Sequence, residues 1–344
     1  MPSATVESAQ SRLPRNRLHD RRQVLTYFAV TTLLGACLRP SFAADWPLRP
    51  VRVLIPFAAG GNSDGMARIL AQRLSQVFEQ QFVIENRVGA GGSLAAVDVA
   101  RSTPDGYTLF WGVTPQISIL PAMTTVKYDP VKDFAPISVL GTSAFVLVVN
   151  ADLPVKTVAE FVDYVRAQPK DKGLAYADGG VGTVSHLAMA LFLKRAGLDM
   201  TPVHYAGNNP ALTAVMGGFL QASFPSVADV LPHVKGGKIR LLAVSTAARA
   251  QQIPDVPTLS ESGFADFNLA SWNGLMAPAG TPKPIIDRIA AEVSRAVRDP
   301  AFAERLVAYG LVPLGNRPEE FAALIAADLP TWANAVRTAG VKLQ

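Results

Sequence analysis

A glycine-rich turn between an expected strand and an expected helix is the first stretch that could do chemistry. The apolar run at 51–55 predicts a buried strand, which ends at Pro56 because proline has no N–H to donate. Gly60-Gly61 allows a tight turn, and one of the residues 62–64 could cap the helix that follows. A strand, a glycine turn and a helix N-terminus can together hold an anion on backbone amides.

Residues 61–65 also match the G-x-S-x-G elbow of serine hydrolases. The elbow needs its serine directly after the strand, but residues 56–60 intervene here. A triad also requires an aspartate and a histidine, and no histidine has a neighbourhood that marks it as the base. We therefore expect Ser63 or Asp64 to cap the helix. An exported hydrolase that uses Ser63 is the alternative hypothesis.

A second glycine loop, at 180–185, approximates the dinucleotide fingerprint with serine in place of the third glycine. No acidic residue closes a strand about twenty residues later, so we expect no NAD and no other cofactor. An anion on the amides of Gly180–Thr183, helped by the hydroxyl of Thr183 or Ser185, is the better prediction. His186 either contacts the ligand or packs at the helix start, and the sequence favours neither.

The sequence suggests no metal site. The chain has four histidines, and its one cysteine lies in the N-terminal segment. It has no H-x-x-x-H pattern and no cluster of carboxylates, so no set of metal ligands can be assembled. Asp229 precedes the sequence Leu231-Pro232-His233 and either faces a cleft or caps a helix. Capping is the simpler expectation.

The elements that must position these loops alternate along the chain. Apolar residues spaced by three and four predict a helix over about 62–78. Short apolar runs predict further strands at 82–84, 107–111, 137–140 and 145–149. Such alternation implies βαβ units and a parallel sheet that is covered on both faces.

From Asn150 the alternation restarts, and after Ser245 its character changes again. Two amphipathic helices near the C-terminus need a sheet to cover, and the first lobe can supply one. We therefore predict a discontinuous first lobe at 45–142 and 246–344, with a second lobe at 143–245 inserted into it. Two α/β lobes joined by two crossings describe a hinged clamshell with a cleft.

Residues 1–44 have the parts of an export signal: an arginine-rich start, an apolar run and small residues. Arg21-Arg22 fits a twin-arginine signal. Cys37 lies in a sequence that resembles a lipoprotein box, so the segment is expected to be removed or to anchor the protein by a lipid. This segment carries six arginines and two acidic residues, which leaves 26 basic and 25 acidic side chains of the 32 and 27 in the whole chain. The remaining charge is nearly balanced and gives no reason to expect nucleic-acid binding.

Several blocks of the chain together resemble the Bug family, the periplasmic solute receptors of tripartite tricarboxylate transporters. These blocks are PFAAGGNSDGMAR (56–68), ENRVGAGG (85–92), PDGYTL (104–109), GVGTVSHLA (180–188) and GGKIRLLAVS (236–245). The resemblance implies a two-lobed α/β clamshell of periplasmic-binding-protein type II. It also implies a monomer in the periplasm that performs no catalysis. Such a protein closes on a small carboxylate, such as an organic, amino or aromatic acid, and delivers it to a membrane permease.

The resemblance places the ligand between the first strand–helix loop and loops of the second lobe. The ligand-binding residues that it predicts, with Asp229 added, are Phe57, Ala59, Gly60, Gly61, Asn62, Asp64, Gly180, Gly182, Thr183, Ser185, Tyr205, Gly207, Asn208 and Asp229. A receptor for a membrane sensor kinase would have the same fold and stays an alternative.

The chain departs from the family pattern at three places. Ala206 stands where a basic residue is common, residues 213–216 lack a common acidic residue, and Ala95 replaces a glycine. Loss of a basic side chain near the cleft favours a monoanionic or partly apolar ligand. Phe57, Trp111 and Trp272 are the expected apolar walls, and this composition of the cleft stays a hypothesis.

Overall fold

The computed structural model describes residues 46–169 and 173–341. The predicted export signal, with its arginine pair and Cys37, lies outside these residues. In the described part of the chain, no helix has the length and apolar character needed to cross a membrane.

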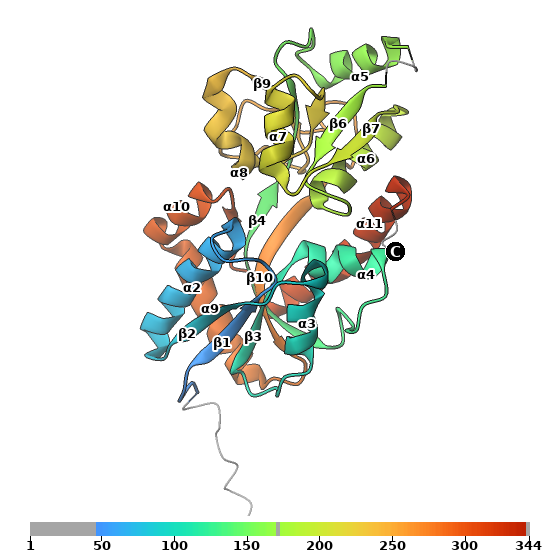
Figure 1. The fold of residues 1–344 in the computed structure, drawn as a ribbon. Coiled ribbons are helices and arrows are strands. Elements are labelled where there is room, and N and C mark those ends of the chain that lie inside the picture. The colour runs from blue at the N-terminus through green and yellow to red at the C-terminus, as the bar shows by residue number, and fades with distance from the viewer. Residues whose placement is uncertain (1–45, 170–172, 342–344) are drawn as a thin grey trace, which may run out of the picture. The chain divides into compact units, whose positions relative to one another are not determined.

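The first sheet has six strands and is mixed rather than parallel. Its strands, in spatial order, are β11 (Val312–Pro313), β4 (Phe134–Ala144), β10 (Ala270–Pro278), β3 (Thr108–Val113), β1 (Val51–Ile55) and β2 (Phe82–Asn86). β1 runs parallel to β2 and β3, as expected, whereas β10 runs antiparallel to β3 and β4. The expected parallel sheet is therefore wrong for this half, because β10 returns from the second lobe in the opposite direction (Figure 1).

Both faces of the first sheet are covered, and the strand sequence shows why. Val51, Val53 and Ile55 belong to one core, while Leu54 belongs to the core on the other face. α2 (Asn62–Phe78), α9 (Lys283–Arg298) and α10 (Pro300–Ala308) contribute to the first core. The second core receives α3 (Ser93–Ala100), the π-helical turn η2 (Pro115–Ile119) and the first half of α11 (Pro318–Ala339). The short helices η1 (Ala90–Gly92) and α4 (Leu120–Met123) flank them.

The second sheet has five strands and is also mixed. Its strands, in spatial order, are β7 (Thr201–His204), β6 (Ala175–Asp178), β8 (Ala222–Ser223), β5 (Val146–Asn150) and β9 (Ile239–Val244). β6 runs parallel to β7 and β8, and β5 runs antiparallel to β8 and β9. The helices of this lobe are α5 (Val158–Ala167), α6 (Val184–Ala196), α7 (Asn208–Met216), α8 (Val227–Val230) and η4 (Leu231–Gly236).

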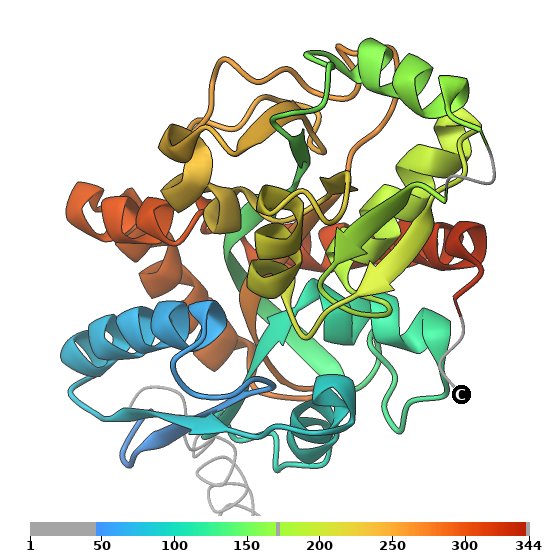
Figure 2. The same cartoon turned by 45° about the horizontal axis from the view of Figure 1, so that its top comes forward.

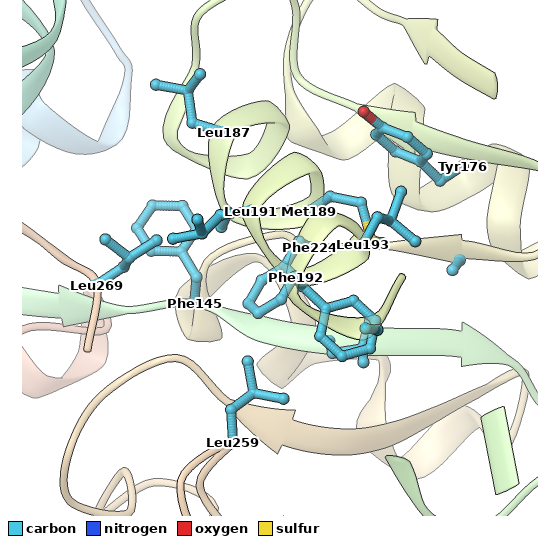
Figure 3. Close-up of a cluster of buried hydrophobic side chains, with 14 of the residues drawn as sticks. Phe145, Tyr176, Leu187, Met189, Leu191, Phe192, Leu193, Phe224, Leu259 and Leu269 are labelled. Carbon is cyan, nitrogen blue, oxygen red and sulfur yellow. The ribbon is translucent and has the colours of Figure 1, made fainter. Parts of the chain in front are cut away.

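α5 and α6 pack on one face of the second sheet, and α7 and α8 pack on the other. Figure 3 shows part of the core that contains α5 and α6, where Leu191 and Phe192 of α6 lie near Phe145. Residues 246–269 were expected in the first lobe, but several of their apolar side chains pack in these second-lobe cores. The lobe boundaries as a whole stay a prediction.

Ser245 forms hydrogen bonds to both segments in which the chain passes between the lobes, at Phe145 and at Leu269. Its hydroxyl accepts a hydrogen bond from the N–H of Phe145 at 3.0 Å and donates to the carbonyl of Leu269 at 2.6 Å. Its backbone bonds to the same two residues, each at 2.8 Å. Ser245 is fully buried, so these bonds form away from water.

α11 packs against both lobes. Phe321 and Ile325 lie in a core of the first sheet, whereas Trp332 and Val336 lie in the core that contains α6. Figures 1 and 2 show α11 passing alongside α6. One helix therefore joins the two lobes in addition to the chain crossings.

Candidate functional site

A cavity of about 620 Å³ is lined by residues of both lobes. This volume lies in the range of small-molecule sites. Its lining gathers the beginnings of α2, η2, α6 and α7, together with η1 and the residue that caps α8. Helix N-termini present unpaired N–H groups and partial positive charge, so the cavity is suited to an anion.

Asp64 shapes the first glycine loop. Its carboxylate accepts hydrogen bonds from the Gly60 N–H, the Asn86 side-chain amide and the Arg68 guanidinium, each at 2.9 Å. The Arg68 guanidinium, together with these two other donors, lowers the pKa of Asp64 to about 2 even though the side chain is buried. Asp64 is thus ionised and supports the loop from behind the cavity.

The N-terminus of α2 has no side-chain cap. Its N-cap is Gly61, and the predicted capping by Asn62, Ser63 or Asp64 is wrong. Asp64 bonds back to Gly60, and the Ser63 hydroxyl donates to Oδ1 of Asn273 at 3.2 Å. No side chain of the described residues therefore caps the first amides of α2, at a cavity that Asn62 and Ser63 line.

In the second glycine loop, most backbone N–H groups already donate hydrogen bonds to acceptors in or next to the loop. The N–H of Gly180 bonds to Asp178, that of Gly182 to Nδ1 of His186, and that of Thr183 to the Gly180 carbonyl. These three amides already have acceptors, so they do not support the expected anion at Gly180–Thr183, which stays a prediction. The Thr183 hydroxyl donates to the Gly180 carbonyl at 2.7 Å and lies 3.0 Å from the Ser185 hydroxyl.

Thr183 also caps α6 by accepting the N–H of His186. The first α6 amides for which no described residue provides an acceptor are those of Val184 and Ser185, and both residues line the cavity. His186 is buried and does not line the cavity, so it is the packed helix-start histidine rather than a ligand contact.

Three side chains beneath the second loop lie close enough to share an ion. The candidate ligand atoms of Asp178, His186 and His204 lie within 4.8 Å of one another. Nδ1 of His204 lies 2.9 and 3.0 Å from the two carboxylate oxygens of the fully buried Asp178. Burial lowers the pKa of His186, which keeps this ring neutral.

The hydrogen bond to His186 opposes metal binding at this cluster. Nδ1 of His186 accepts the Gly182 N–H, so its proton is on Nε2. A metal-binding histidine instead donates its second N–H to an acceptor. The cluster therefore fits a hydrogen-bonded support for the loop better than a metal site.

Asp229 both caps a helix and reaches the cavity. It forms a capping box with Ser226 at the start of α8, as expected. Its Oδ2 also accepts the side-chain amide of Asn208 at 2.7 Å. Asn208 is the first residue of α7, whose N-cap Gly207 provides no side-chain cap.

A third glycine turn, at Gly89–Gly92, belongs to the site although it was not predicted there. Gly89, Gly91 and Gly92 line the cavity, and Gln116 Nε2 donates to the Gly91 carbonyl at 2.7 Å. Gly92 has φ +88°, and a Cβ there would lie 2.4 Å from Nε2 of Gln116. The signal was present, because Gly89–Gly92 stands between a strand and a helix as the first loop does.

The structure separates the predicted site residues into two groups. Those that line the cavity are Phe57, Asn62, Gly182, Thr183, Ser185, Gly207, Asn208 and Asp229. Those that lie outside its lining are Ala59, Gly60, Gly61, Asp64, Gly180 and Tyr205. A direct role for any of them in ligand binding stays a prediction.

The apolar walls are only partly those expected. Phe57 lines the cavity, but Trp111 and Trp272 are fully buried in the cores on the two faces of the first sheet. The other apolar walls are Pro56, Val88, Pro115, Ile119, Leu120, Met123, Phe145, Val181 and Val184.

The charge of the lining is low. Among the described residues that line the cavity there is no lysine, arginine or histidine, and Asp229 is the single acidic side chain. Attraction for an anion must therefore come from backbone amides and helix dipoles rather than from a basic side chain.

Comparisons with known proteins agree with this architecture. Residues 66–341 match the model of the tripartite tricarboxylate transporter family receptor. BugT of Bordetella pertussis is 32% identical over 323 residues, which cover 93% of this chain and 98% of BugT.

Two solved structures from Rhodopseudomonas palustris are also similar. Rpa4515, solved with adipate, is 33% identical with a TM-score of 0.75 over 86% of this chain and 99% of that chain. MatC, solved with malate, is 33% identical with a TM-score of 0.71 over 85% and 100% of the two chains. The expected two-lobed α/β fold is confirmed, and the chain belongs to the receptor family of the tripartite tricarboxylate transporters, whose members are periplasmic solute-binding proteins.

Proposed function

We propose that this protein is an extracytoplasmic receptor that captures a small carboxylate in the cavity between its lobes. It then delivers the carboxylate to a permease of the tripartite tricarboxylate transporter type. The relatives solved with adipate and malate support a carboxylate as the ligand. The protein acts in the periplasm as a monomer and performs no covalent chemistry.

One observation carries this proposal: the uncapped N-terminus of α2 at the cavity. Gly61 provides no side chain, and Asp64 bonds back to Gly60, so the first helix amides have no side-chain acceptor. A ligand carboxylate supplies the acceptor and gains from the positive end of the helix dipole. Hydrogen bonds to a charged group contribute about 1.5–3 kcal/mol each.

The apolar walls restrict the ligand further. With no basic side chain in the described lining, a second carboxylate would have to be neutralised by dipoles alone. Phe57, Leu120 and Met123 offer contact to a hydrocarbon body. The ligand therefore carries one net negative charge at most and has an apolar part.

The substitution Gly61→Asp tests the α2 amides directly. Gly61 has φ −80° and ψ 170°, which any residue adopts, and a Cβ there would have Ala58 O at 3.7 Å as its nearest neighbour. Aspartate is a favoured N-cap, so its carboxylate would occupy the amides that the ligand needs. We expect α2 to be stabilised by about 0.3 kcal/mol and ligand affinity to fall roughly 10- to 100-fold, measured by calorimetric titration.

The control is Gly236→Asp, which makes the same charge change at an exposed glycine with no atom within 4 Å of its added Cβ. Gly236 does not line the cavity, so carboxylate affinity should stay at the wild-type value. If Gly61→Asp also binds carboxylates as the wild type does, the α2 amides do not hold the ligand and the proposal fails.

Delivery to a permease needs a cellular measurement. Native mass spectrometry of freshly purified protein identifies the co-purified acid, and uptake of that acid is then followed in cells with and without the receptor gene. Uptake should depend on the receptor. A signalling response that persists without any uptake would favour the sensor-kinase alternative instead.

A further inference from the structure

Asp229 is the single acidic residue in the described lining of the cavity. Its Oδ2 accepts three hydrogen bonds, from Asn208 Nδ2 at 2.7 Å, from Ser226 Oγ at 2.7 Å and from Ser226 N at 3.1 Å. These bonds fix the direction of the carboxylate. The other oxygen, Oδ1, accepts no hydrogen bond from any residue in the described ranges, although a carboxylate oxygen has two lone pairs.

Gln116 offers a second acceptor from the opposite lobe. Its side chain is 2% exposed, and its Nε2 donates to the Gly91 carbonyl at 2.7 Å, which orients the amide. Its Oε1 is buried and has no partner in the described part of the chain. A buried acceptor without a donor is costly, and few are left in native structures. A hydrogen-bond donor on the ligand would satisfy it.

The distribution of these groups is asymmetric. The starts of α2 and α6 supply donors, while Asp229 and Gln116 supply acceptors that nothing in the described chain satisfies. Apolar side chains fill much of the remaining lining. A ligand with only carboxylates and carbon would match the donors and leave both acceptors unpaired.

On the basis of the proposed function, we infer that the ligand is a zwitterion, an amino acid with an apolar side chain. Its carboxylate binds at the α2 N-terminus, its ammonium pairs with Oδ1 of Asp229, and Oε1 of Gln116 accepts a further hydrogen. Asp229 is then the residue that determines specificity, because it attracts a cationic group and repels a second carboxylate. The pairing also satisfies both acceptors at once.

Pairs of ligands that differ only in the amino group test this inference on the wild-type protein. Leucine is compared with 4-methylpentanoate, and phenylalanine with 3-phenylpropanoate, by calorimetric titration at pH 7.4 and fixed salt, with adipate as the dicarboxylate. We expect the amino acid of at least one pair to bind at least about tenfold more tightly than its partner, because a site built to pair a donor rejects the analogue that lacks it.

Two variants assign the preference to Asp229. Asp229→Asn keeps the shape of the capping box and removes the charge, and it should reduce the preference to less than about threefold. Asp163→Asn, at a side chain that is 79% exposed on α5, makes the same charge change outside the cavity and should keep the preference. Thermal unfolding confirms that each variant is folded.

The outcomes separate this inference from the proposed function. The zwitterion inference is contradicted if the des-amino acids or adipate bind more tightly, or if the preference persists in Asp229→Asn. The proposed function as a carboxylate receptor is not affected by either result. If none of the carboxylates binds the wild-type protein, the proposed function itself fails. Because the ligand pairs are measured on the wild type, the inference can be contradicted even if a variant does not fold.

Discussion

The two glycine loops that face each other across the cavity occupy equivalent places in their lobes but use their amides differently. Each follows a strand, precedes a helix and is supported by a buried aspartate, Asp64 in one lobe and Asp178 in the other. The first loop leaves the helix amides open because Gly61 is the N-cap. The second loop bonds its amides internally, and Thr183 caps its helix.

This difference shows that a glycine-rich turn before a helix is not by itself an anion site. What matters is whether a side chain already occupies the helix amides. The supporting aspartates also differ in their partners, since Asp64 pairs with an arginine and Asp178 with a histidine. The first support is an ion pair with a guanidinium, whereas the second is a hydrogen bond to an imidazole ring.

The largest effect is expected at the support of the first loop. Asp64→Asn removes the charge that pairs with Arg68 and places an NH₂ group opposite hydrogen-bond donors of the loop. The free energy of unfolding should therefore fall by about 2–3 kcal/mol at pH 7. Because the folded pKa is lowered to about 2, the carboxylate stabilises the protein above about pH 4, and this stabilisation is lost as the pH falls toward 2.

The measurement is denaturant unfolding of both proteins between pH 2 and pH 7. The difference in free energy of unfolding between the wild type and Asp64→Asn should disappear as the pH approaches 2. Asp98→Asn is the matched control, since Asp98 pairs with Arg87 at an exposed site and should matter far less. A gap that does not change with pH would mean that the charge of Asp64 is not what supports the loop.

A third aspartate, the partly buried Asp328, sharpens the comparison because no described residue pairs it with a cation. Asp328 on α11 accepts the indole N–H of Trp272 at 2.6 Å, and burial raises its pKa to about 6 although hydrogen bonds from Trp272 and Trp332 oppose this. The folded pKa lies above the unfolded value, so the stabilisation by this group is full below about pH 4 and is lost as the pH rises through 6.

Asp328→Asn should therefore stabilise the protein by about 2 kcal/mol at pH 8 and by almost nothing at pH 4. The asparagine oxygen still accepts the indole N–H. Thermal unfolding at the two pH values measures the difference. Destabilisation at pH 8 would show that the carboxylate has a compensating partner, as Asp64 does.

The smallest effect is expected at the cap of the second loop. Thr183→Val removes the hydroxyl that caps α6 and should cost about 1 kcal/mol of stability. Ligand affinity should change by less than about threefold, because this hydroxyl already donates to the Gly180 carbonyl.

Thr157→Val is a matched control, since Thr157 caps α5 in the same way and lies outside the cavity lining. The two variants should lose similar stability in chemical denaturation. A tenfold loss of affinity in Thr183→Val alone would mean that the Thr183 hydroxyl bonds the ligand, and the contrast between the two loops would fail.

The sequence predicted the elements of the fold better than their directions. A continuous apolar run and an apolar spacing of three to four located β1 and α2 closely, because β1 is buried on both faces and α2 buries one face. The antiparallel course of β10 was not predictable from its own residues, since direction depends on where the chain returns after residues 246–269. Trp111 was misplaced in the cleft because both faces of its strand are covered.

The site was predicted at the level of loops but not of hydrogen bonds. Glycine turns at the starts of helices identify where two chain segments meet the cavity. The donors that remain open depend on side chains from distant elements, such as Asn86 for the first loop and His204 for the second. Spacing within a motif carries no information about these partners.

The hydroxyl of Ser245 has a mechanical consequence. One oxygen atom bonds to both Phe145 and Leu269, so the chain crossings beside it are joined within a few ångströms. A bend at one crossing would stretch a bond to the other, so this hydroxyl opposes separate bending of the two crossings. Because α11 also packs on both lobes, a rotation of one lobe against the other has to accommodate this pair of bonds and the α11 contacts together.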